Sequence, residues 1–343
     1  MSVIIVRNLP EEVWQGYVLS HPQGNIFHTP EMFEVFKRVK CHEPELWAAM
    51  RNDQIQALML PVRINLLNFP LGHWLTTRSI VYGSVLVVDS QDGREALARL
   101  LSEYVREADA KSIFTELRNL ADLRSLQLTL NEQGFFSIKH LNYLIDLDLR
   151  PEEVFNNIGP RTRKNIKRAL RKDVIQFEEV NDKKGINECY FILKQSYRRA
   201  HVPLADLSLF ESALDILLPK KMIRISLARI EGKPAAISVD LLYKGVIFGW
   251  YGGVDRNFRS FFPNEVLTWE VLKWGAENGF RYYDFGGAGR PDQEYGVRNF
   301  KAKFGGQIVS FDRNICIHSP FRYRLSLFGY HILRRALYGR KYN

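Results

Sequence analysis

Apolar residues recur at helical spacing in the first half of the chain. Positions 97, 100, 101, 104, 105 and 108 carry Leu, Leu, Leu, Tyr, Val and Ala. Because a helix repeats every 3.6 residues, these side chains lie on one face. The pattern predicts a long amphipathic helix that begins after Asp92-Gly93.

A second helix is predicted after Pro263. Asn264 is a suitable capping residue, and Gly279 is well placed to end the helix. Three apolar residues at helical spacing share its buried face: Leu267, Val271 and Trp274.

Short apolar runs predict strands on both sides of these helices. They span Leu46–Met50, Ile55–Val62, Ile80–Val88, Ile113–Leu117, Leu141–Leu149, Ile223–Ile230, Ala235–Tyr243, Val246–Tyr251 and Tyr282–Phe285. Strands and helices therefore alternate along the chain, which indicates an α/β fold with helices flanking its sheets.

The predicted elements follow the same order in each half of the chain. A strand ends in a polar turn, two further strands follow, and then come a long helix and another strand. The polar turns are Arg51-Asn52-Asp53 and Glu231-Gly232-Lys233-Pro234. This order predicts an internal duplication. We expect domains at 1–150 and 151–318 and a tail at 319–343, with the boundary near Leu149–Pro151.

The composition is compatible with two folded domains, and the chain as a whole is positively charged. The 343 residues are 46% hydrophobic and 25% charged, which is typical of globular proteins that bury a core. The formal net charge of +10 favours anionic partners such as nucleotides, RNA, phosphates or acidic membranes. It does not choose among them.

Several common chemistries lack a motif in this chain. The three cysteines are widely spaced, which predicts neither disulfides nor a zinc site and fits a reducing cytoplasm. No stretch approaches the roughly 20 apolar residues of a membrane-spanning helix, so we expect a soluble or peripheral protein. Walker A, Gly-x-Ser-x-Gly, His-Glu-x-x-His and Cys-x-x-Cys motifs are absent, and eight histidines are scattered. We expect no metal and no cofactor.

Three segments of the chain carry family motifs. They are Phe27-His28-Thr29-Pro30-Glu31-Met32-Phe33 with Lys37, the basic run Arg161–Ala169, and the stretch from Gly249 to Gly306. The last contains Tyr251-Gly252-Gly253, Asp284-Phe285-Gly286-Gly287 and Phe300-Lys301-Ala302-Lys303-Phe304-Gly305-Gly306. Together they resemble the Fem family of peptidoglycan interpeptide-bridge aminoacyltransferases.

The resemblance implies a fold and an activity. Fem-type proteins are tandems of two acetyltransferase-like domains, which agrees with the duplication inferred above. They take an aminoacyl group from aminoacyl-tRNA and place it on an amine of a peptidoglycan precursor stem peptide. That precursor is UDP-linked or lipid-linked.

The same resemblance places Lys301 near the reacting centre. An ammonium at this point would stabilise the oxyanion formed as the ester is attacked. In that role its replacement leaves folding unchanged. The alternative is a surface lysine beside a hairpin. Lys303 is expected to face the opposite way if the segment is extended.

A basic helix is predicted from Arg161 to Lys172. Four of its cations share one face, at i, i+3, i+4 and i+7: Lys164, Lys167, Arg168 and Arg171. Such a stripe suits the phosphates of tRNA or of a pyrophosphate. The alternative is a solvated helix near the domain junction.

Two further cations are candidates for holding the phosphates of the acceptor. Lys37 matches the lysine of the family's opening helix. Arg199 matches an arginine on the helix after the basic segment, and its guanidinium suits phosphate oxygens. Either is alternatively an ordinary surface charge.

The remaining candidates shape a substrate groove. Asp284 is a possible general base, but we favour a structural role at the end of a strand. The other groove residues implied by the resemblance are Tyr251, Gly252, Gly253, Phe300 and Phe304.

The tail alternates rings and bases from Phe321 to Tyr342, with Arg334, Arg335, Arg340 and Lys341 among its cations. This pattern predicts a basic amphipathic helix that lies on an anionic membrane. The alternative is a helix docked on the second domain.

Two other functions stay open. The first keeps the fold but acylates a polysaccharide or lipid-linked precursor from acyl-CoA. Against it, no acetyltransferase-type Q/R-x-x-G-x-G/A loop precedes either long helix. The second is a non-catalytic tRNA- or membrane-binding module.

Overall fold

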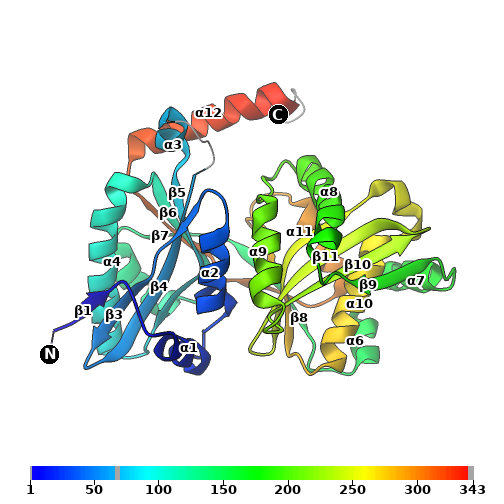
Figure 1. Cartoon of the computed structure of the whole chain (residues 1–343), viewed down its shortest axis with the longest axis horizontal. Coiled ribbons are helices and arrows are strands. Elements are labelled where there is room, and N and C mark those ends of the chain that lie inside the picture. The colour runs from blue at the N-terminus through cyan, green and yellow to red at the C-terminus, as the bar shows by residue number, and fades with distance from the viewer. Residues whose placement is uncertain (1, 66–69, 339–343) are drawn as a thin grey trace. The chain divides into compact units, whose positions relative to one another are not determined.

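The structure, a computed structural model, describes residues 2–65 and 70–338. These residues form two compact units (Figure 1). Unit 1 draws on Met1–Lys37, Cys41–Ile138 and Asp312–Asn343, and unit 2 on Arg38–Lys40 and Lys139–Phe311. Among the residues described, no helix is both long and apolar enough to cross a bilayer.

Unit 1 is built on one mixed sheet. Its strand order is β1 (Ile4–Val6), β3 (Trp47–Arg51), β4 (Gln54–Ile64), β5 (Arg78–Val87), β6 (Phe114–Asn119), β15 (Arg313–Ile317) and β7 (Phe136–Ile138), with β2 (His42–Pro44) on β4. Among the described strands of this unit, only β5 and β6 pair in parallel. The helices are α1 (Glu11–Ser20), α2 (Pro30–Arg38), α3 (Pro70–Thr76), α4 (Gln91–Lys111), α5 (Gln127–Glu132) and α12 (Pro320–Tyr338).

Unit 2 repeats this plan. Its order is β14 (Gln307–Ser310), β8 (Leu141–Asp146), β13 (Tyr282–Gly287), β12 (Val246–Val254), β11 (Lys233–Tyr243), β10 (Ile223–Ile230) and β9 (Ile175–Glu179). The parallel pair here is β12 and β13. The helices are α6 (Pro151–Asn157), α7 (Pro160–Leu170), α8 (Lys183–Ala200), α9 (Leu207–Leu217), α10 (Pro263–Glu277) and α11 (Gly296–Lys301).

Each unit takes one strand from beyond its own sequence half. β8 follows β7 in the chain but pairs with β13 and β14 of unit 2. Conversely, β15 follows β14 but pairs with β6 and β7 of unit 1. The predicted boundary near residue 150 is therefore wrong, and so is the assignment of 313–318 to the second domain. An apolar run predicts a strand but does not identify its hydrogen-bonding partners.

Both predicted long helices are present, but the N-terminus of α10 is not capped by the predicted residue. In α4, Ser90 caps the N-terminus and Leu97, Leu100 and Leu101 are fully buried. α10 begins at Pro263 after Phe262, without a side-chain cap, so the prediction that Asn264 caps it is wrong. Gly279, with φ of +72°, follows its end as expected.

All nine predicted strands are present, most with ends shifted by one to three residues. Several short strands at or near the sheet edges were not predicted, among them β1, β2, β7 and β9. Their three to five residues are too few to show a clear period.

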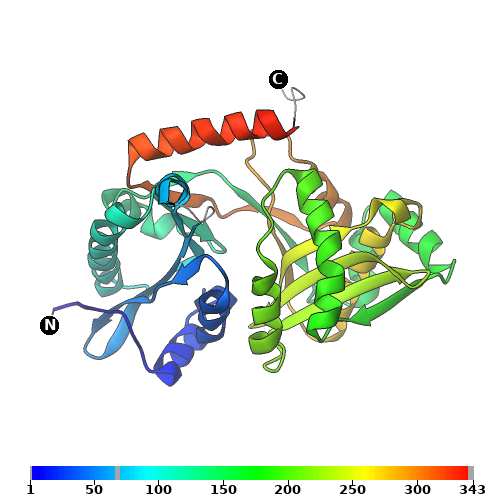
Figure 2. The same cartoon turned by 45° about the horizontal axis from the view of Figure 1, so that its top comes forward.

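The C-terminal tail is a helix, α12, that belongs to unit 1 (Figure 2). It packs against α3, and the Tyr323 ring meets Phe114 edge-on at 5.6 Å. Docking on the second domain, the alternative considered above, is therefore wrong. Arg340 and Lys341 lie outside the described residues, and so do the side chains of Arg334 and Arg335.

Candidate functional site

The parallel strands β12 and β13 part in the middle of unit 2. They pair from Val246 with Tyr282 to Phe248 with Asp284. Beyond this point β12 continues beside β11, and Gly287 pairs with Asn142 of β8. Strands that separate leave backbone N–H and C=O groups that need other partners.

Lys301 supplies those partners for β13. Its Nζ donates hydrogen bonds to the carbonyl oxygens of Phe285 (2.6 Å), Gly286 (3.3 Å) and Gly287 (2.8 Å). The side chain comes from the last residue of α11, and the residue is only 6% exposed. Three bonds use all the donors of an ammonium. Lys301 therefore fastens the end of β13 to α11.

This geometry changes the interpretation of Lys301. A surface lysine is excluded because the residue is buried. The three hydrogen bonds favour a different expectation for its replacement, a loss of stability, because three carbonyls would lose their donor. Its role at the oxyanion stays a prediction. To stabilise an oxyanion directly, the Lys301 ammonium would have to give up at least one of its hydrogen bonds to these carbonyl oxygens and donate to the oxyanion in its place.

Asp284 lies beside Lys301 at the same strand end. Its Oδ1 accepts a hydrogen bond from Gly286 N at 2.7 Å. Burial raises the pKa of Asp284 to about 6, against the lowering effects of the Gly286 N–H and of Lys301. Burial lowers the pKa of Lys301 to about 8, and Asp284 opposes that shift. Asp284 thus holds the turn through the Gly286 N–H, and its charge and that of Lys301 influence each other.

Gly286 is required by this turn. Its φ of +68° lies in the left-handed region, and a Cβ there would sit 3.3 Å from the Phe248 ring. Phe304 is fully buried and packs against Phe285 and Phe300. Phe304 thus supports the strand end from the core, and Phe300 is the more exposed of the predicted pair.

The residues after Lys301 are helical rather than extended. A 3₁₀ turn spans Ala302–Phe304. The Lys303 ammonium lies 3.0 Å from a carboxylate oxygen of Glu265, at an exposed position. Lys303 and Lys301 therefore differ in environment, although for a reason other than strand alternation.

Aromatic side chains line β12 where it leaves β13. The Tyr251 ring contacts Tyr197 of α8 at 5.6 Å and Phe210 of α9 at 4.8 Å. The Tyr197 hydroxyl is hydrogen-bonded to the Gly252 backbone. Gly253 is buried, and a Cβ there would meet Ile192 at 3.2 Å. Tyr197 was not among the predicted site residues, although it is two positions from Arg199 on the same helix.

The basic segment forms the predicted helix, α7. Thr162, Ile166 and Ala169 are its buried residues. The four predicted cations Lys164, Lys167, Arg168 and Arg171 are exposed.

Aromatic rings lie under some of these cations. The Lys167 Nζ is 5.5 Å from the centroid of Phe155, and the Arg168 guanidinium carbon is 5.1 Å from that of Phe262. The Lys172 Nζ is 4.9 Å from the centroid of Phe261. Because Phe261 and Phe262 precede α10, positive charge gathers at the start of that helix.

The two predicted acceptor cations belong to different units. Lys37 is on α2, with a 63% exposed side chain and an ion pair to Glu34. Arg199 is on α8, where it donates to Val254 O at 2.6 Å and Ser196 Oγ at 3.0 Å. Part of the Arg199 guanidinium therefore holds the end of β12.

A second buried carboxyl lies under the same sheet. Asp240 of β11 accepts hydrogen bonds from the Ser238 hydroxyl at 2.8 Å and the Tyr283 hydroxyl at 3.0 Å. Burial raises the pKa of Asp240 to about 6. The prediction missed this cluster because Asp240 stands alone in an apolar strand and its partners come from the fold.

These carboxyls predict a pH dependence of stability. The folded chain keeps protons on Asp240 and Asp284 up to about pH 6, whereas their ordinary pKa is 3.8. These two carboxyls should therefore lower the free energy of unfolding as the pH rises from about 4 to about 6, whereas carboxyls whose pKa is lowered, such as Glu188, contribute in the opposite direction. In chemical denaturation across this range, Asp240→Asn should lose part of the destabilising contribution, so its free energy of unfolding should change more positively with pH than that of the wild type. Asp53→Asn, at an exposed turn, should match the wild-type slope, and an unchanged slope in Asp240→Asn would contradict the assignment.

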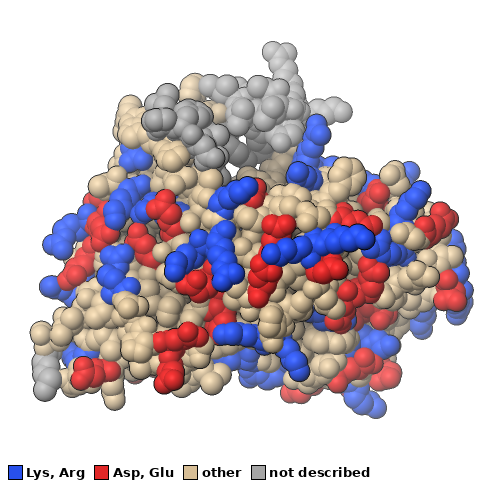
Figure 3. Space-filling model, viewed as in Figure 1, with Lys and Arg blue, Asp and Glu red and all other residues tan. Residues whose placement is uncertain are grey.

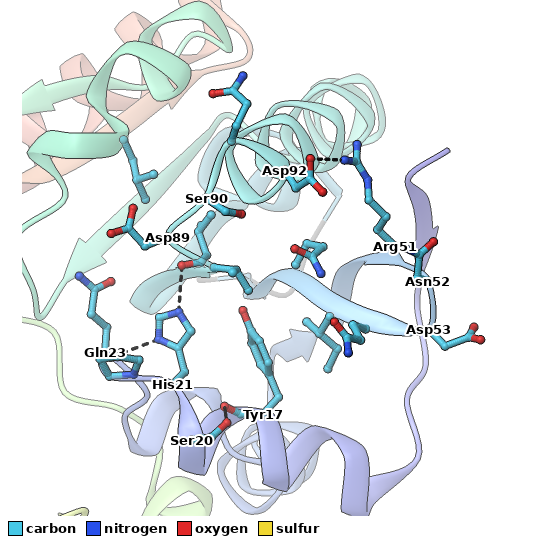
Figure 4. Close-up of a pocket in the computed structure, with 18 of the residues that line it drawn as sticks. Tyr17, Ser20, His21, Gln23, Arg51, Asn52, Asp53, Asp89, Ser90 and Asp92 are labelled. Carbon is cyan, nitrogen blue, oxygen red and sulfur yellow. Dashed lines mark hydrogen bonds and ion pairs between the residues drawn. The ribbon is translucent and has the colours of Figure 1, made fainter. Parts of the chain in front are cut away.

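A cavity of about 1080 Å³ lies in unit 1, between α1, the β3–β4 turn and the start of α4 (Figure 4). Its polar lining includes the carboxylates of Asp53, Asp89 and Asp92. Asp92 is paired with Arg51. Because the carboxylates surround the first turn of α4, the helix start is unsuited to a pyrophosphate.

Charge is mixed over the face seen in Figure 3, where Lys and Arg alternate with Asp and Glu. The net positive charge of the chain therefore does not form one continuous basic surface on this face. No group of His, Cys, Asp and Glu side chains suited to a metal ion occurs within residues 2–65 and 70–338.

Comparisons with known proteins agree with this architecture. Residues 160–301 match the model of an acetyltransferase (GNAT) domain family. The lipid II:glycine glycyltransferase of Staphylococcus haemolyticus (strain JCSC1435) is 20% identical, over 87% of this chain and 89% of that protein. A crystal structure of FemX superposes with a TM-score of 0.71 at 18% identity, covering 95% of this chain and 99% of the other. A tandem GNAT protein from the clavulanic acid biosynthesis pathway superposes with a TM-score of 0.60 at 10% identity, covering 93% and 99%.

The repeated sheet plan, with a parallel strand pair that separates in unit 2, defines an acyltransferase of the tandem acetyltransferase fold. This confirms the predicted fold class. Within that class the chain is similar to proteins of the Fem type, the family that its three motifs resemble.

Proposed function

We propose that this chain moves an aminoacyl group from aminoacyl-tRNA to an amine of a peptidoglycan precursor stem peptide. Both substrates would be bound together, so that proximity supplies much of the acceleration. Charged tRNA is a cytoplasmic molecule, and the proposal accordingly assigns the protein to the cytoplasm. With a lipid-linked acceptor, it would work at the inner face of the membrane.

The observation that carries the proposal is the similarity to a lipid II:glycine glycyltransferase along 87% of this chain. That relative is named for a lipid-linked acceptor and a glycyl group. A lipid-linked precursor is therefore the acceptor we favour over a UDP-linked one.

The cations beside the start of α10 in unit 2 support substrates that carry phosphate. Arg168 and Lys172 lie over Phe262 and Phe261, directly before α10. α10 itself begins with Pro263, which has no N–H to offer an anion. Side-chain cations therefore supplement a helix start that offers one amide fewer than usual.

The acyl-CoA alternative uses the same fold. The helix start most comparable in unit 1, that of α4, is surrounded by Asp89 and Asp92. The start of α10 lacks one amide N–H. Both features weaken the helix N-terminus as a pyrophosphate site, and they favour a donor other than CoA.

A radiolabel experiment tests the donor and the acceptor together. Purified protein is given lipid-linked or UDP-linked precursor with labelled aminoacyl-tRNA or labelled acetyl-CoA. Label should pass from charged tRNA to the precursor and not from acetyl-CoA. Transfer from acetyl-CoA alone would overturn the tRNA donor, and binding of charged tRNA without any transfer would favour a non-catalytic module.

The acceptor cations give a kinetic prediction. Lys37→Ala and Arg199→Ala should each raise the acceptor KM by about ten- to a hundredfold and leave the donor KM unchanged, because a charge-assisted hydrogen bond to phosphate is lost. Arg199→Ala also loses the bond to Val254 O, so its unfolding midpoint is measured alongside. Arg198→Ala, an exposed neighbour, is the control. Equal changes in both KM values would contradict the assignment.

A further inference from the structure

α12 exposes large apolar side chains to solvent. Phe321 is 71% exposed and Phe328 is 63% exposed. Leu325 and Leu327 are exposed as well. Exposed apolar residues are ordinary when scattered, but three of these four share one face of the helix and form a patch that needs an explanation.

Three of these exposed residues lie on the side of α12 that is turned away from its contacts with unit 1. Tyr323 packs against Phe114, and the Arg322 guanidinium donates to Trp74 O of α3 at 2.9 and 2.7 Å. These contacts fix which side of the helix is turned inward. Phe321, Leu325 and Phe328 follow at i, i+4 and i+7 and so share the opposite face.

Trp74 of α3 exposes a further aromatic ring beside Arg322 of α12. Its side chain is partly exposed, and the Arg322 guanidinium carbon lies 5.4 Å from its ring centroid. An exposed tryptophan beside an arginine is the combination that membrane interfaces favour, because the ring is amphipathic and the cation meets the headgroups.

The charge of α12 selects the partner. Between Pro320 and Tyr338 the sequence contains four arginines, at 322, 324, 334 and 335, and no Asp or Glu. The whole chain carries a net charge of +10. A helix with exposed rings and only positive charge is complementary to an anionic lipid surface, to which each cation adds attraction.

We propose that α12, together with Trp74 of α3, docks this protein on the surface of an anionic bilayer. Phe321, Leu325 and Phe328 enter the region between headgroups and acyl chains, and Arg324 remains among the headgroups. The helix lies on the bilayer and does not cross it. This contact goes beyond the transfer reaction and does not depend on it, although it would bring the protein to a lipid-linked acceptor.

Vesicle co-sedimentation of the full-length protein tests the contact without tRNA or precursor. Vesicles of phosphatidylcholine alone are compared with vesicles of equal parts phosphatidylcholine and phosphatidylglycerol. Binding should be at least about tenfold tighter to the anionic vesicles and should weaken with added salt. Equal binding to both vesicles, or no binding to either, would overturn the proposal.

Substitutions then assign the binding to this face. The double variant Phe321→Ser/Phe328→Ser should reduce binding to anionic vesicles by about tenfold or more, because two rings no longer leave water. Phe191→Ser is the matched control, since Phe191 of α8 is also 63% exposed but belongs to unit 2. It should bind like the wild type.

Two outcomes would refute the assignment. One is unchanged vesicle binding in the double variant. The other is a patch that binds a second copy of the chain: light scattering would then show a dimer that the double variant abolishes, while vesicle binding stays the same. Because no substrate is present, a failure here leaves the proposed transfer reaction untouched, and a failure of transfer leaves this result standing.

Discussion

Replacing Lys301 with methionine should both destabilise unit 2 and lower the rate of transfer by about a hundredfold or more. The ammonium bonds three carbonyls at the end of β13. Methionine fills the space but donates nothing, and each buried carbonyl left without a donor costs about 1–3 kcal/mol. A strand end that moves by even about 1 Å at a reacting centre can reduce the rate about a hundredfold. Chemical denaturation and steady-state kinetics measure the two effects.

The pair of readouts separates a positioning residue from one that contacts the oxyanion. If Lys301→Met unfolds at the wild-type denaturant concentration while kcat falls about a hundred- to a thousandfold, the oxyanion role holds and the fastening role is wrong. If both quantities fall, Lys301 positions the strand. Lys303→Met is the control, because its exposed pair with Glu265 contributes little. If Lys301→Met has the stability and the turnover of the wild type, Lys301 neither positions the strand nor stabilises the oxyanion.

Neutralising the basic face of α7 should have the second large effect. Replacing Lys164, Lys167, Arg168 and Arg171 with glutamine should weaken the binding of charged tRNA by about a hundredfold or more at low salt. Each lost phosphate contact should also reduce the slope of log affinity against log salt by about 0.7–0.9. Filter binding over a salt series measures both quantities.

A matched control separates local contact from net charge. Replacing Arg94, Arg99, Arg106 and Lys111 of α4 with glutamine removes the same four charges from a helix of unit 1. If α7 contacts the phosphates, the α4 variant keeps most of the affinity and the wild-type slope. Equal losses in the two variants would mean that only the overall field attracts tRNA, and the α7 assignment would fail.

Local sequence patterns were sufficient for most of the elements. α4 and β10 could be predicted because their apolar residues repeat with the helical or strand period, and that period follows from local backbone geometry. Cap residues were less certain. Asn264 is a good capping residue in isolation, but the chain enters α10 through Phe262 in a left-handed conformation, which no local pattern indicates.

The candidate site was predictable only where a motif marked it. Lys301, Asp284 and the α7 cations came from motifs shared with the Fem family. Tyr197 and Asp240 carry no motif, and they join the site region through contacts with residues 43 to 55 positions away. Such pairings depend on strand order and helix packing.

The sequence by itself determined the alternation of strands and helices, the duplication and the resemblance to the Fem family, because periodicity and motifs are local properties of the chain. Only the tertiary structure decided that β8 and β15 exchange sheets, since hydrogen-bond partners are chosen by the assembled sheet and not by an apolar run. It also decided the environment of Lys301. A lysine is solvated in most sequences, but here separating strands leave three carbonyls within its reach, and their need for a donor compensates for burying its charge.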